Sequence, residues 1–252
     1  MDVHYLPPNR HTKSAKEYFL DLLIIFVAVI LGFIANDARE KYVEKAKAKE
    51  YARLVHNDLK TDLSAIQQTI SDKEWIEAKY DSVENILATK DIRRYNEFIY
   101  YVERYLSNNS IFTSRDITFQ QSRYTGNDDA IKSMRLYKEI AGYYLHNNQY
   151  KTVENSYETS YKNDLNGIES KLFNPRDLTN LDNNKATNFQ SLVLRPAIPL
   201  KPIRRDIENL KFFYIKIDNA KKHANYTKLL LKEQKVYGLN IIKDLKKEFD
   251  LE

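Results

Sequence analysis

Five histidines are the side chains best suited to chemistry in this sequence, and their spacing argues against a metal site or a catalytic pair. They are His4, His11, His56, His146 and His223. No two of them lie three or four residues apart, the spacing that places two ligands on one helix face, and there is no HExxH motif. We interpret His56 and His223, which lie among charged residues, as surface side chains. His4 and His11 leave open only a weak metal site in the N-terminal tail.

Other signatures of catalysis or cofactor binding do not occur in the chain. The phosphate-binding loops GxxxxGK[ST] and GxGxxG are missing, as is the GxSxG nucleophile elbow. Because there is no cysteine, a disulfide scaffold, a cysteine-ligated metal, a cysteine nucleophile and a lipoprotein anchor are excluded. The adjacent Asp128 and Asp129 fit a helix start, where carboxylates complement the helix dipole. We therefore predict no catalytic residue, no cofactor, no metal ligand and no enzyme activity.

Two sets of side chains form a candidate partner surface instead. The chain has 19 tyrosines, which suit either a thin helical core or an interface because each combines an apolar ring with a polar tip. A basic segment interleaved with prolines suits anionic headgroups, an acidic partner or a plain connector. The residues of the candidate surface are Tyr100, Tyr101, Tyr105, Arg195, Lys201, Arg204 and Arg205.

The charge distribution does not suggest nucleic-acid binding. The net charge is +5, and residues 201–252, with 13 Lys/Arg and 8 Asp/Glu, carry all of it. Nucleic-acid-binding domains usually show a denser basic face. We interpret the charged residues as solvated helix surface.

The first structural element that the sequence predicts is an apolar segment near the N-terminus. The run LLIIFVAVILGFIA extends from Leu22 to Ala35, and residues 18–20 lengthen it, with Asp21 as the only charge. Eighteen residues span about 27 Å as a helix, close to the hydrocarbon thickness of a bilayer. We predict a transmembrane helix over residues 14–36. Its anchoring residues are Tyr18, Phe19, Leu22, Ile25, Ala28, Gly32 and Ala35.

Three other interpretations of this segment are less consistent with its sequence. A cleaved signal peptide needs small residues before the cleavage site, whereas the run is followed by Asn36 and Asp37. A buried core helix or an interfacial helix would have a polar face, which residues 22–35 lack. Ala28 and Gly32 form one small-xxx-small pair, which either occurs by chance or marks a helix dimer seam.

Two features of the sequence give opposite indications of the side of the membrane on which the soluble domain lies. More lysines and arginines follow the segment than precede it, which favours a cytoplasmic C-terminal domain. In contrast, a short basic N-terminal tail commonly stays in the cytoplasm, and the chain that follows the membrane helix is then exported. We expect a single-pass protein of the cytoplasmic (inner) membrane, with a slight preference for a periplasmic soluble domain.

The remaining chain is predicted to be helical. No glycine or proline lies between Gly32 and Gly126, so long helices are favoured over tight turns. We expect an irregular tail over 1–13 and a helical soluble domain over 37–252. That domain comprises a long helix over 37–90, helices over 92–172, an Asn/Pro-rich loop over 173–203 and a C-terminal helix over 204–249. If the long helix is interrupted, the N-cap pair Ser71–Asp72 is the favoured position. Within 92–172 we place helices at 92–106, 114–124 and 129–172.

The C-terminal helix carries a heptad pattern. Its apolar positions fall at alternating steps of three and four residues, at Leu210, Phe213, Ile217, Ala220, Ala224, Thr227 and Leu231. The pattern indicates either packing within the chain or a self-associating coiled coil. The predicted fold is all-α, with a transmembrane helix that continues into a long helix and packs with later helices as an elongated helical bundle.

Two segments resemble a family of single-pass membrane-anchored helical proteins common in Bacteroidota. The first is the anchor with the helix after it, where Leu20, Asp21, Gly32, Asn36 and Arg39 occupy matching positions. The second is TFQQSRYTGNDDAIKSMRLYKEIAGYY at residues 118–144. The resemblance implies an architecture and no chemistry, and the chain lacks the tryptophan that the family has near the anchor.

Together these features predict a membrane-tethered helical scaffold or accessory subunit that acts by protein–protein interaction. Its partners would be the lipid bilayer and either another protein or a second copy, and no nucleic acid. The alternative is a sensory helical module that binds a ligand between its helices and signals through a partner.

Overall fold

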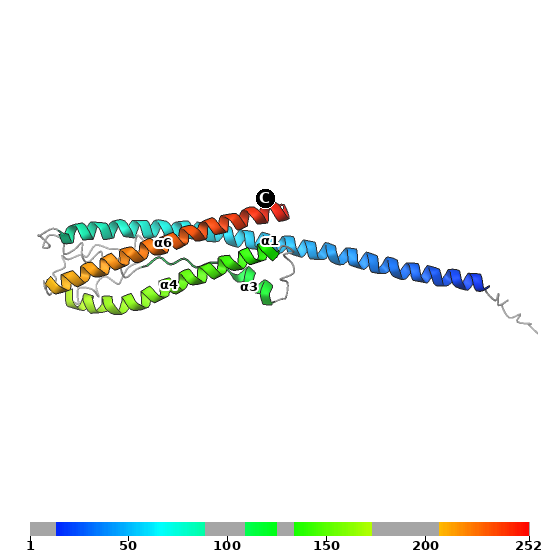
Figure 1. Cartoon of the computed structure of the whole chain (residues 1–252), viewed down its shortest axis with the longest axis horizontal. Coiled ribbons are helices and arrows are strands. Elements are labelled where there is room, and N and C mark those ends of the chain that lie inside the picture. The colour runs from blue at the N-terminus through cyan, green and yellow to red at the C-terminus, as the bar shows by residue number, and fades with distance from the viewer. Residues whose placement is uncertain (1–13, 89–108, 125–133, 173–206, 252) are drawn as a thin grey trace, which may run out of the picture. The chain divides into compact units, whose positions relative to one another are not determined.

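The computed structural model describes residues 14–88, 109–124, 134–172 and 207–251. These residues form four helices and no strand: α1 (Ala15–Ala88), α3 (Ile117–Tyr124), α4 (Met134–Leu172) and α6 (Ile207–Phe249) (Figure 1). The prediction of an all-α fold with one long N-terminal helix is therefore confirmed. The predicted tail at 1–13, helix at 92–106 and loop at 173–203 lie outside the described residues. The chain divides into two compact units, residues 1–50 and 51–252, and α1 contributes to both.

Helix α1 begins with a capping box and has no interruption over its 74 residues. The Ser14 hydroxyl accepts from the Glu17 backbone N–H, while the Glu17 carboxylate accepts from the Ser14 N–H at 2.7 Å. Of the two alternatives, the unbroken helix is the one observed, and Ser71–Asp72 does not interrupt it. The carboxylate of Asp72 accepts instead from Gln68 at 3.0 Å and from Ser110 at 2.9 Å, so it holds a neighbouring segment rather than capping a new helix.

The first unit is described by the N-terminal part of α1, in which every side chain from Ala15 to Lys47 is exposed. This part contains a window of 18 residues with a mean hydropathy of 2.7, none of it buried. It is the one described helix whose length and composition suit a membrane span, and a signal sequence meets the same criteria. The apolar side chains from Ala15 to Lys47 therefore lie outside the core formed by the described residues.

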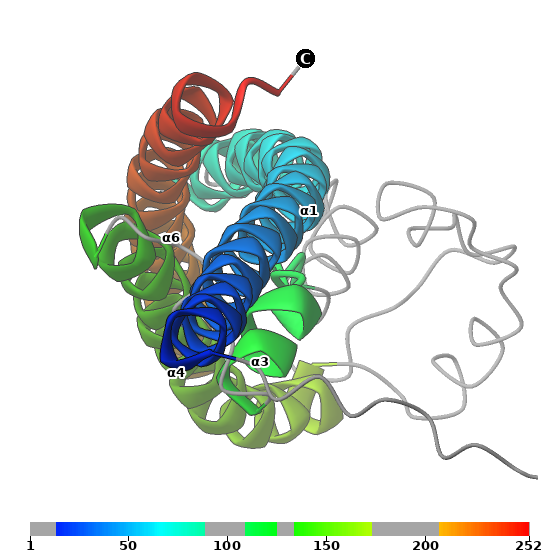
Figure 2. The same ribbon diagram turned by 90° about the vertical axis from the view of Figure 1, so that its right-hand side faces the viewer.

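The second unit is built on three long helices: the C-terminal part of α1, α4 and α6. Lys73 pairs with Glu154 and Asp62 with Tyr143, so α1 and α4 run in the same direction. Arg135 pairs with Asp244 and Lys216 with Asp164, so α6 runs opposite to α4. Viewed end-on, α3 and α6 lie on different sides of the bundle (Figure 2).

All three long helices bury a seam with alternating steps of three and four residues, the spacing of helices packed as in a coiled coil. The predicted seam of α6 is buried from Phe213 to Leu231 within this chain, which confirms packing inside the chain. The side chain of Leu210 lies outside the described set. The seam of α1 comprises Val55, Leu59, Asp62, Ile66, Thr69, Lys73, Ile76, Tyr80 and Val83, and all nine are buried.

The apolar core forms two clusters along the bundle. One joins the four helices through residues such as Leu59, Phe119, Ile140 and Leu245. The other lies further along α1, with Ile66, Ile70, Phe112, Tyr150 and Leu231. Polar seam residues lie beside and between these clusters, and they form the site described below.

An extended segment, residues 109–116, runs back along α1 before α3 begins. Ser110 contacts Asp72, the Arg115 N–H contacts Asp62, and Thr118 contacts Asp58, so the segment is antiparallel to α1. The helix predicted over 114–124 starts later, at Ile117, because the residues before it contact α1 and α4 in an extended conformation. We call residues 109–116 the strap.

Candidate functional site

The predicted partner surface lies outside the residues that the structure describes. It comprises Tyr100, Tyr101, Tyr105, Arg195, Lys201, Arg204 and Arg205. The predicted anchoring residues lie on the exposed N-terminal part of α1. An added Cβ at Gly32 would meet no atom within 4 Å, so no described residue covers the Ala28/Gly32 pair on that side.

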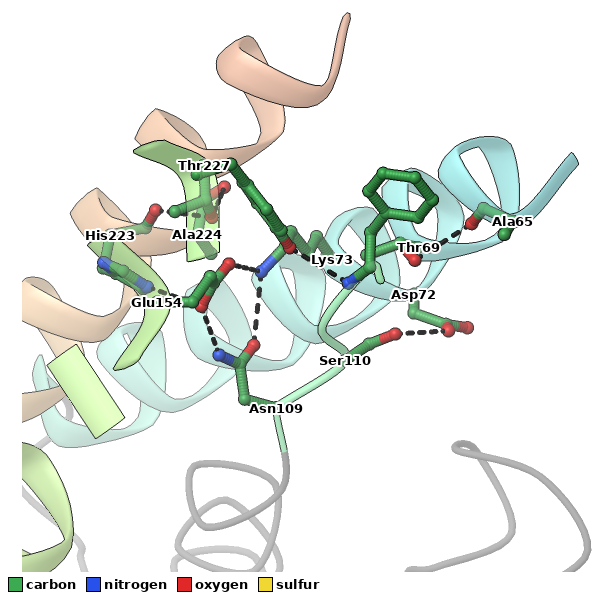
Figure 3. A network of polar contacts seen from close by, with 12 residues as sticks. Ala65, Thr69, Asp72, Lys73, Asn109, Ser110, Glu154, His223, Ala224 and Thr227 are labelled. Carbon is green, nitrogen blue, oxygen red and sulfur yellow. Dashed lines mark hydrogen bonds and ion pairs between the residues drawn. The ribbon is translucent and has the colours of Figure 1, made fainter. Parts of the chain in front are cut away.

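The most unusual feature of the described bundle is a buried ion pair between Lys73 on α1 and Glu154 on α4. Lys73 Nζ lies 2.7 Å from Glu154 Oε1, and the two side chains are 2% and 0% exposed. A buried charge without a partner costs several kcal/mol, so each of these groups requires the other. The pair therefore fixes the axial register of α1 against α4 (Figure 3).

Two further residues complete the hydrogen bonding of this pair. The Asn109 carbonyl accepts from Lys73 Nζ at 3.2 Å, and the Asn109 amide donates to Glu154 Oε2 at 2.6 Å. His223 Nε2 lies 3.0 Å from the same Glu154 oxygen. The cluster of Lys73, Asn109, Glu154 and His223 thus joins α1, the strap, α4 and α6 at one point, and we call it the polar junction (Figure 3).

The ionisation of the junction follows from this geometry. Burial opposes ionisation of Glu154, but the His223 hydrogen bond and the charge and hydrogen bond of Lys73 outweigh it and lower the pKa of Glu154 to about 2. Burial lowers the pKa of Lys73, and the Glu154 carboxylate partly restores it. Glu154 is therefore ionised at neutral pH, and its carboxylate favours the ammonium form of Lys73.

The imidazole of His223 is held by stacking as well as by its hydrogen bond. Its ring lies parallel to that of Tyr157, with centroids 3.7 Å apart, and Tyr157 stacks on Tyr161 with centroids 4.8 Å apart. The prediction that His223 is a solvated surface residue is wrong, since its side chain is only 11% exposed. The prediction for His56 is also wrong, because this residue is buried on α1.

This arrangement is suited to holding helices together and not to reacting. Both oxygens of Glu154 already accept from strong donors, and neither the carboxylate nor the ammonium of Lys73 is accessible to a substrate. A general base needs a free lone pair within hydrogen-bonding distance of the proton it removes. The junction therefore specifies which helix faces meet, as buried polar residues do in coiled coils.

A second polar layer, nearer the start of the bundle, fastens the strap. Asp62 accepts from the Arg115 N–H at 2.9 Å and from the Tyr143 hydroxyl at 3.1 Å. The Tyr144 hydroxyl donates to the Arg115 carbonyl at 3.1 Å, and the Tyr150 hydroxyl accepts from the Phe112 N–H at 3.3 Å. Burial raises the pKa of Asp62 to about 6, although the Arg115 and Tyr143 hydrogen bonds oppose this. The backbone of the strap thus finds on neighbouring helices the partners that a helix would supply internally.

These tyrosines support one of the two interpretations of the tyrosine content. Tyr80, Tyr143, Tyr144, Tyr150 and Tyr161 are buried, so they act as core residues. Burial raises the pKa of the Tyr143 and Tyr144 hydroxyls, which remain protonated and able to donate.

A shallow surface groove lies between α4 and α6. It has a volume of about 570 Å³ and is lined by His146, Lys232, Glu233, Val236, Tyr237 and Asn240. His146 Nδ1 lies 2.5 Å from Gln234 Oε1, and Gln234 also donates to the Tyr143 carbonyl at 2.9 Å. The groove is an exposed depression, and its lining residue His146 is held by the hydrogen bond to Gln234. Among the residues the structure describes, no group of three or more His, Asp or Glu side chains could hold a metal ion.

Sequence reasoning missed the polar junction because it followed apolar residues alone. On α4 the buried positions Tyr143, Asn147, Tyr150, Glu154 and Tyr161 keep the steps of a heptad seam. Extending the seam strictly by spacing would have placed Asn147 and Glu154 on the buried face. The same rule on α1 would have found Asp62 and Lys73.

Comparisons of this chain with protein-family models, curated proteins and solved structures gave no match.

Proposed function

We propose that this protein is a membrane-tethered helical scaffold or accessory subunit, which acts by holding a folded bundle at a bilayer for contact with another protein. The observation that carries the proposal is the apolar window of α1. Its 18 residues are entirely unburied although their mean hydropathy is 2.7, and hydrophobic surface of that extent is stable in a lipid environment rather than in water.

The bundle supports a positional role rather than a chemical one. Its described interior contains apolar clusters and paired polar groups, as at Lys73 and Glu154. Polar seam residues cost stability unless they are fully paired, and they select one register and one set of neighbours. A rigid, uniquely packed bundle suits a protein whose surface must be presented in one shape.

We further propose that the chain belongs to the Bacteroidota family that its anchor resembles, and that it is a single-pass protein of the cytoplasmic membrane with its bundle on the periplasmic side. Capping of α1 by Ser14 and Glu17 fits a helix that starts just before the apolar run. Topology is tested by fusing reporters active only inside or only outside the cytoplasm after Glu252. An active cytoplasmic reporter would reverse the proposed side.

The scaffold role is tested by photo-crosslinking the full chain in native membranes and identifying the products by mass spectrometry. We expect one reproducible crosslinked protein that is lost when the chain is absent. Crosslinks to lipid alone would contradict a scaffold. A small molecule that raised the unfolding temperature of the purified chain would favour the sensory module instead, because a ligand that binds only the folded form stabilises it.

A further inference from the structure

The strap is bound by side chains of α1 and α4 that contact its backbone. The Arg115 N–H donates to Asp62, and the Arg115 carbonyl accepts from Tyr144. The Phe112 N–H donates to Tyr150, and the Phe112 ring, 2% exposed, enters the second apolar cluster. Extended peptides are recognised by such main-chain hydrogen bonds together with pockets for alternate side chains. We call this surface the strap site; it is formed by Asp58, Asp62, Asp72, Tyr144, Asn147 and Tyr150.

Three carboxylates of α1 in the strap site receive only neutral donors. Asp58 accepts from the Thr118 hydroxyl, Asp62 from the Arg115 N–H, and Asp72 from the Ser110 hydroxyl. Asp62 is 1% and Asp72 5% exposed. Among the described residues, no lysine or arginine forms an ion pair with any of the three. We call these three carboxylates the acidic row.

The cations nearest to the acidic row are committed elsewhere or turned away. Lys73, next to Asp72, lies 2.7 Å from Glu154. Arg115 contributes its backbone to Asp62, while its side chain is exposed. The strap therefore supplies hydrogen bonds to the acidic row but no counter-charge.

The missing counter-charge is unfavourable because two members of the row are close together. Asp58 and Asp62 are one helical turn apart, about 6 Å of rise, where like charges destabilise a helix. Burial, and to a smaller extent the charge of Asp58, raise the pKa of Asp62 to about 6, against the hydrogen bonds from Arg115 and Tyr143. A buried carboxylate is stabilised most by a cation that is also a hydrogen-bond donor. One lysine or arginine between these two carboxylates would serve both.

An uncharged side chain of the strap site independently lacks a donor. The amide nitrogen of Asn147 donates to the Ser114 hydroxyl at 2.7 Å, so this side chain is directed at the strap. Its carbonyl oxygen has no hydrogen-bond partner, although Asn147 is only 1% exposed. A buried acceptor without a donor is unfavourable. The site thus offers more acceptors than the strap can satisfy.

The spacing of the acidic row matches an extended peptide. Asp62 and Asp72 are ten residues apart, which is about 15 Å along α1. Their partners on the strap, Arg115 and Ser110, are five residues apart, which is about 17 Å of extended chain. An extended segment antiparallel to α1 can therefore reach all three carboxylates in turn.

We propose that the strap site binds an extended basic segment of a partner protein and that the strap occupies the site when this partner is absent. The proposal rests on the scaffold function and names the chemistry of its partner. The segment would place an aromatic residue where Phe112 lies, and lysine or arginine where Ser110 and Thr118 lie. A second copy of the chain would bring an identical strap with the same neutral donors, so an exchange of straps would leave the row uncompensated.

The test uses the full chain in nanodiscs of zwitterionic lipid and two labelled peptides with the sequence of residues 109–120. The site peptide carries Ser110→Lys and Thr118→Lys, the two positions that face Asp72 and Asp58. The control peptide has the same net charge and carries Thr113→Lys and Ile117→Lys, whose side chains are exposed in the protein. We expect the site peptide to bind at least about tenfold more tightly, with an affinity that falls as salt is raised. Equal binding of the two peptides would overturn the proposal.

Release of the strap is measured in the same experiment. The chain has no cysteine, so Thr113→Cys places a single spin label on the exposed side of the strap. We expect the mobility of this label to increase as the site peptide binds. Binding without a change in label mobility would place the peptide elsewhere and contradict the proposal.

Variants of the full chain locate the binding surface. Asp58→Asn/Asp72→Asn keeps an acceptor for Thr118 and Ser110, so the bundle should stay folded while the affinity for the site peptide falls at least about tenfold. Asp58→Asn alone, at the half-buried member of the row, should lower the affinity in the same direction. Glu74→Gln, at a carboxylate of α1 that is 51% exposed and faces Lys232 of α6, is the matched control and should leave binding unchanged. If the double variant bound like wild type, the acidic row would not be the site.

A second variant weakens the strap instead of the site. The strap competes with any peptide at the high effective concentration of a tethered segment. Ser110→Ala/Thr118→Ala removes two of its hydroxyl donors and keeps the carboxylates, so the site peptide should bind this variant at least about threefold more tightly than wild type. Weaker or equal binding would show that the peptide and the strap do not share a site.

Crosslinking in native membranes separates this proposal from the scaffold function. We expect the crosslinked partner to be lost in Asp58→Asn/Asp72→Asn and kept in Glu74→Gln. If the double variant yields the same partner as wild type, the strap site is wrong and the scaffold function stands. If the wild-type chain yields no crosslinked protein, the scaffold function fails.

Discussion

The phenol oxygen of Tyr237 on α6 lies against Gly142 on α4, where the Cβ of any other residue would have to be. The Tyr237 ring also meets Tyr143 edge-on, with centroids 6.5 Å apart. Glycine in the middle of a helix costs about 1 kcal/mol relative to alanine. Here the missing side chain lets α6 bring an aromatic residue close to α4.

Gly142→Ala tests this contact. The added methyl group must displace the Tyr237 phenol, and overpacking typically costs about 1–3 kcal/mol, more than the gain in helix propensity. We expect a loss of about 1 kcal/mol in the free energy of unfolding, measured by urea denaturation. In a Tyr237→Phe background the same change should become stabilising, because the nearest atom to the new methyl group is then the ring carbon Cζ at 3.4 Å, an ordinary van der Waals contact. Gly167→Ala, where a Cβ would meet no atom within 4 Å, is the control and should stabilise the protein.

Glu154→Gln tests the polar junction. The substitution leaves the ammonium of Lys73 buried without a counter-charge, for which we expect a loss of about 3–5 kcal/mol in the free energy of unfolding. Arg135→Ala breaks an ion pair whose arginine is 63% exposed, and it should change the stability far less than Glu154→Gln because solvent screens the pair. If Glu154→Gln proved as mild as Arg135→Ala in thermal unfolding, the junction would not fix the helix register.

Asp62→Asn tests the fastening of the strap through its pH dependence. The folded pKa of Asp62, about 6, exceeds the ordinary value of 3.8, so the folded state binds the proton more tightly than the unfolded state. The contribution of Asp62 to stability is therefore greatest below about pH 4 and declines as pH rises to about 6. The difference between the two pKa values corresponds to about 3 kcal/mol.

The expected result is a flatter stability profile for Asp62→Asn between pH 4 and 7, with equal or higher stability than wild type at pH 7. The amide keeps an acceptor for the Arg115 N–H and can donate to the Tyr143 hydroxyl. Asp58→Asn, at a half-buried carboxylate that accepts from Thr118, is the neighbouring control. A wild-type-like slope in Asp62→Asn would show that another group causes the pH dependence.

Phe26→Arg together with Ile30→Arg tests the anchor. Both side chains lie in the apolar part of α1, and an arginine near the centre of a transmembrane helix costs about 2.5–3.5 kcal/mol on insertion scales. We expect the variant protein to become extractable by alkaline carbonate, whereas wild type stays in the membrane pellet. Tyr42→Arg, at an exposed residue outside the apolar run, should stay with the membrane. A pelleted double variant would contradict a membrane-spanning segment.

The helices of this protein could be predicted from periodicity and from the scarcity of glycine and proline. The seam of α6 from Phe213 to Leu231 was found because apolar side chains occupy nearly every position. Glu154 and Lys73 were not predicted to be buried because only apolar residue types were assigned to the core. The spacing of residues along a helix, however, decides which side chains face inward. The burial of His223 had no local signal, since its partner Glu154 is 69 residues away.

The strap could not have been predicted for a related reason. Its sequence is compatible with an early start of α3, and it is extended because Asp62, Tyr144 and Tyr150 satisfy its backbone groups. Those partners are 29 to 53 residues away along the chain. A local pattern cannot report hydrogen bonds that only tertiary packing creates.

The parallel course of α1 and α4 also affects the order of events during synthesis. Lys73 and Glu154 are separated by 81 residues, and a ribosome adding about 5–20 residues per second needs on the order of 10 s to make that stretch. Throughout this interval the seam of α1 has neither α4 nor α6 to cover it. The nascent chain therefore exposes Val55, Leu59, Ile66 and Ile70 for seconds after α1 is made, and we expect chaperones to bind α1 first.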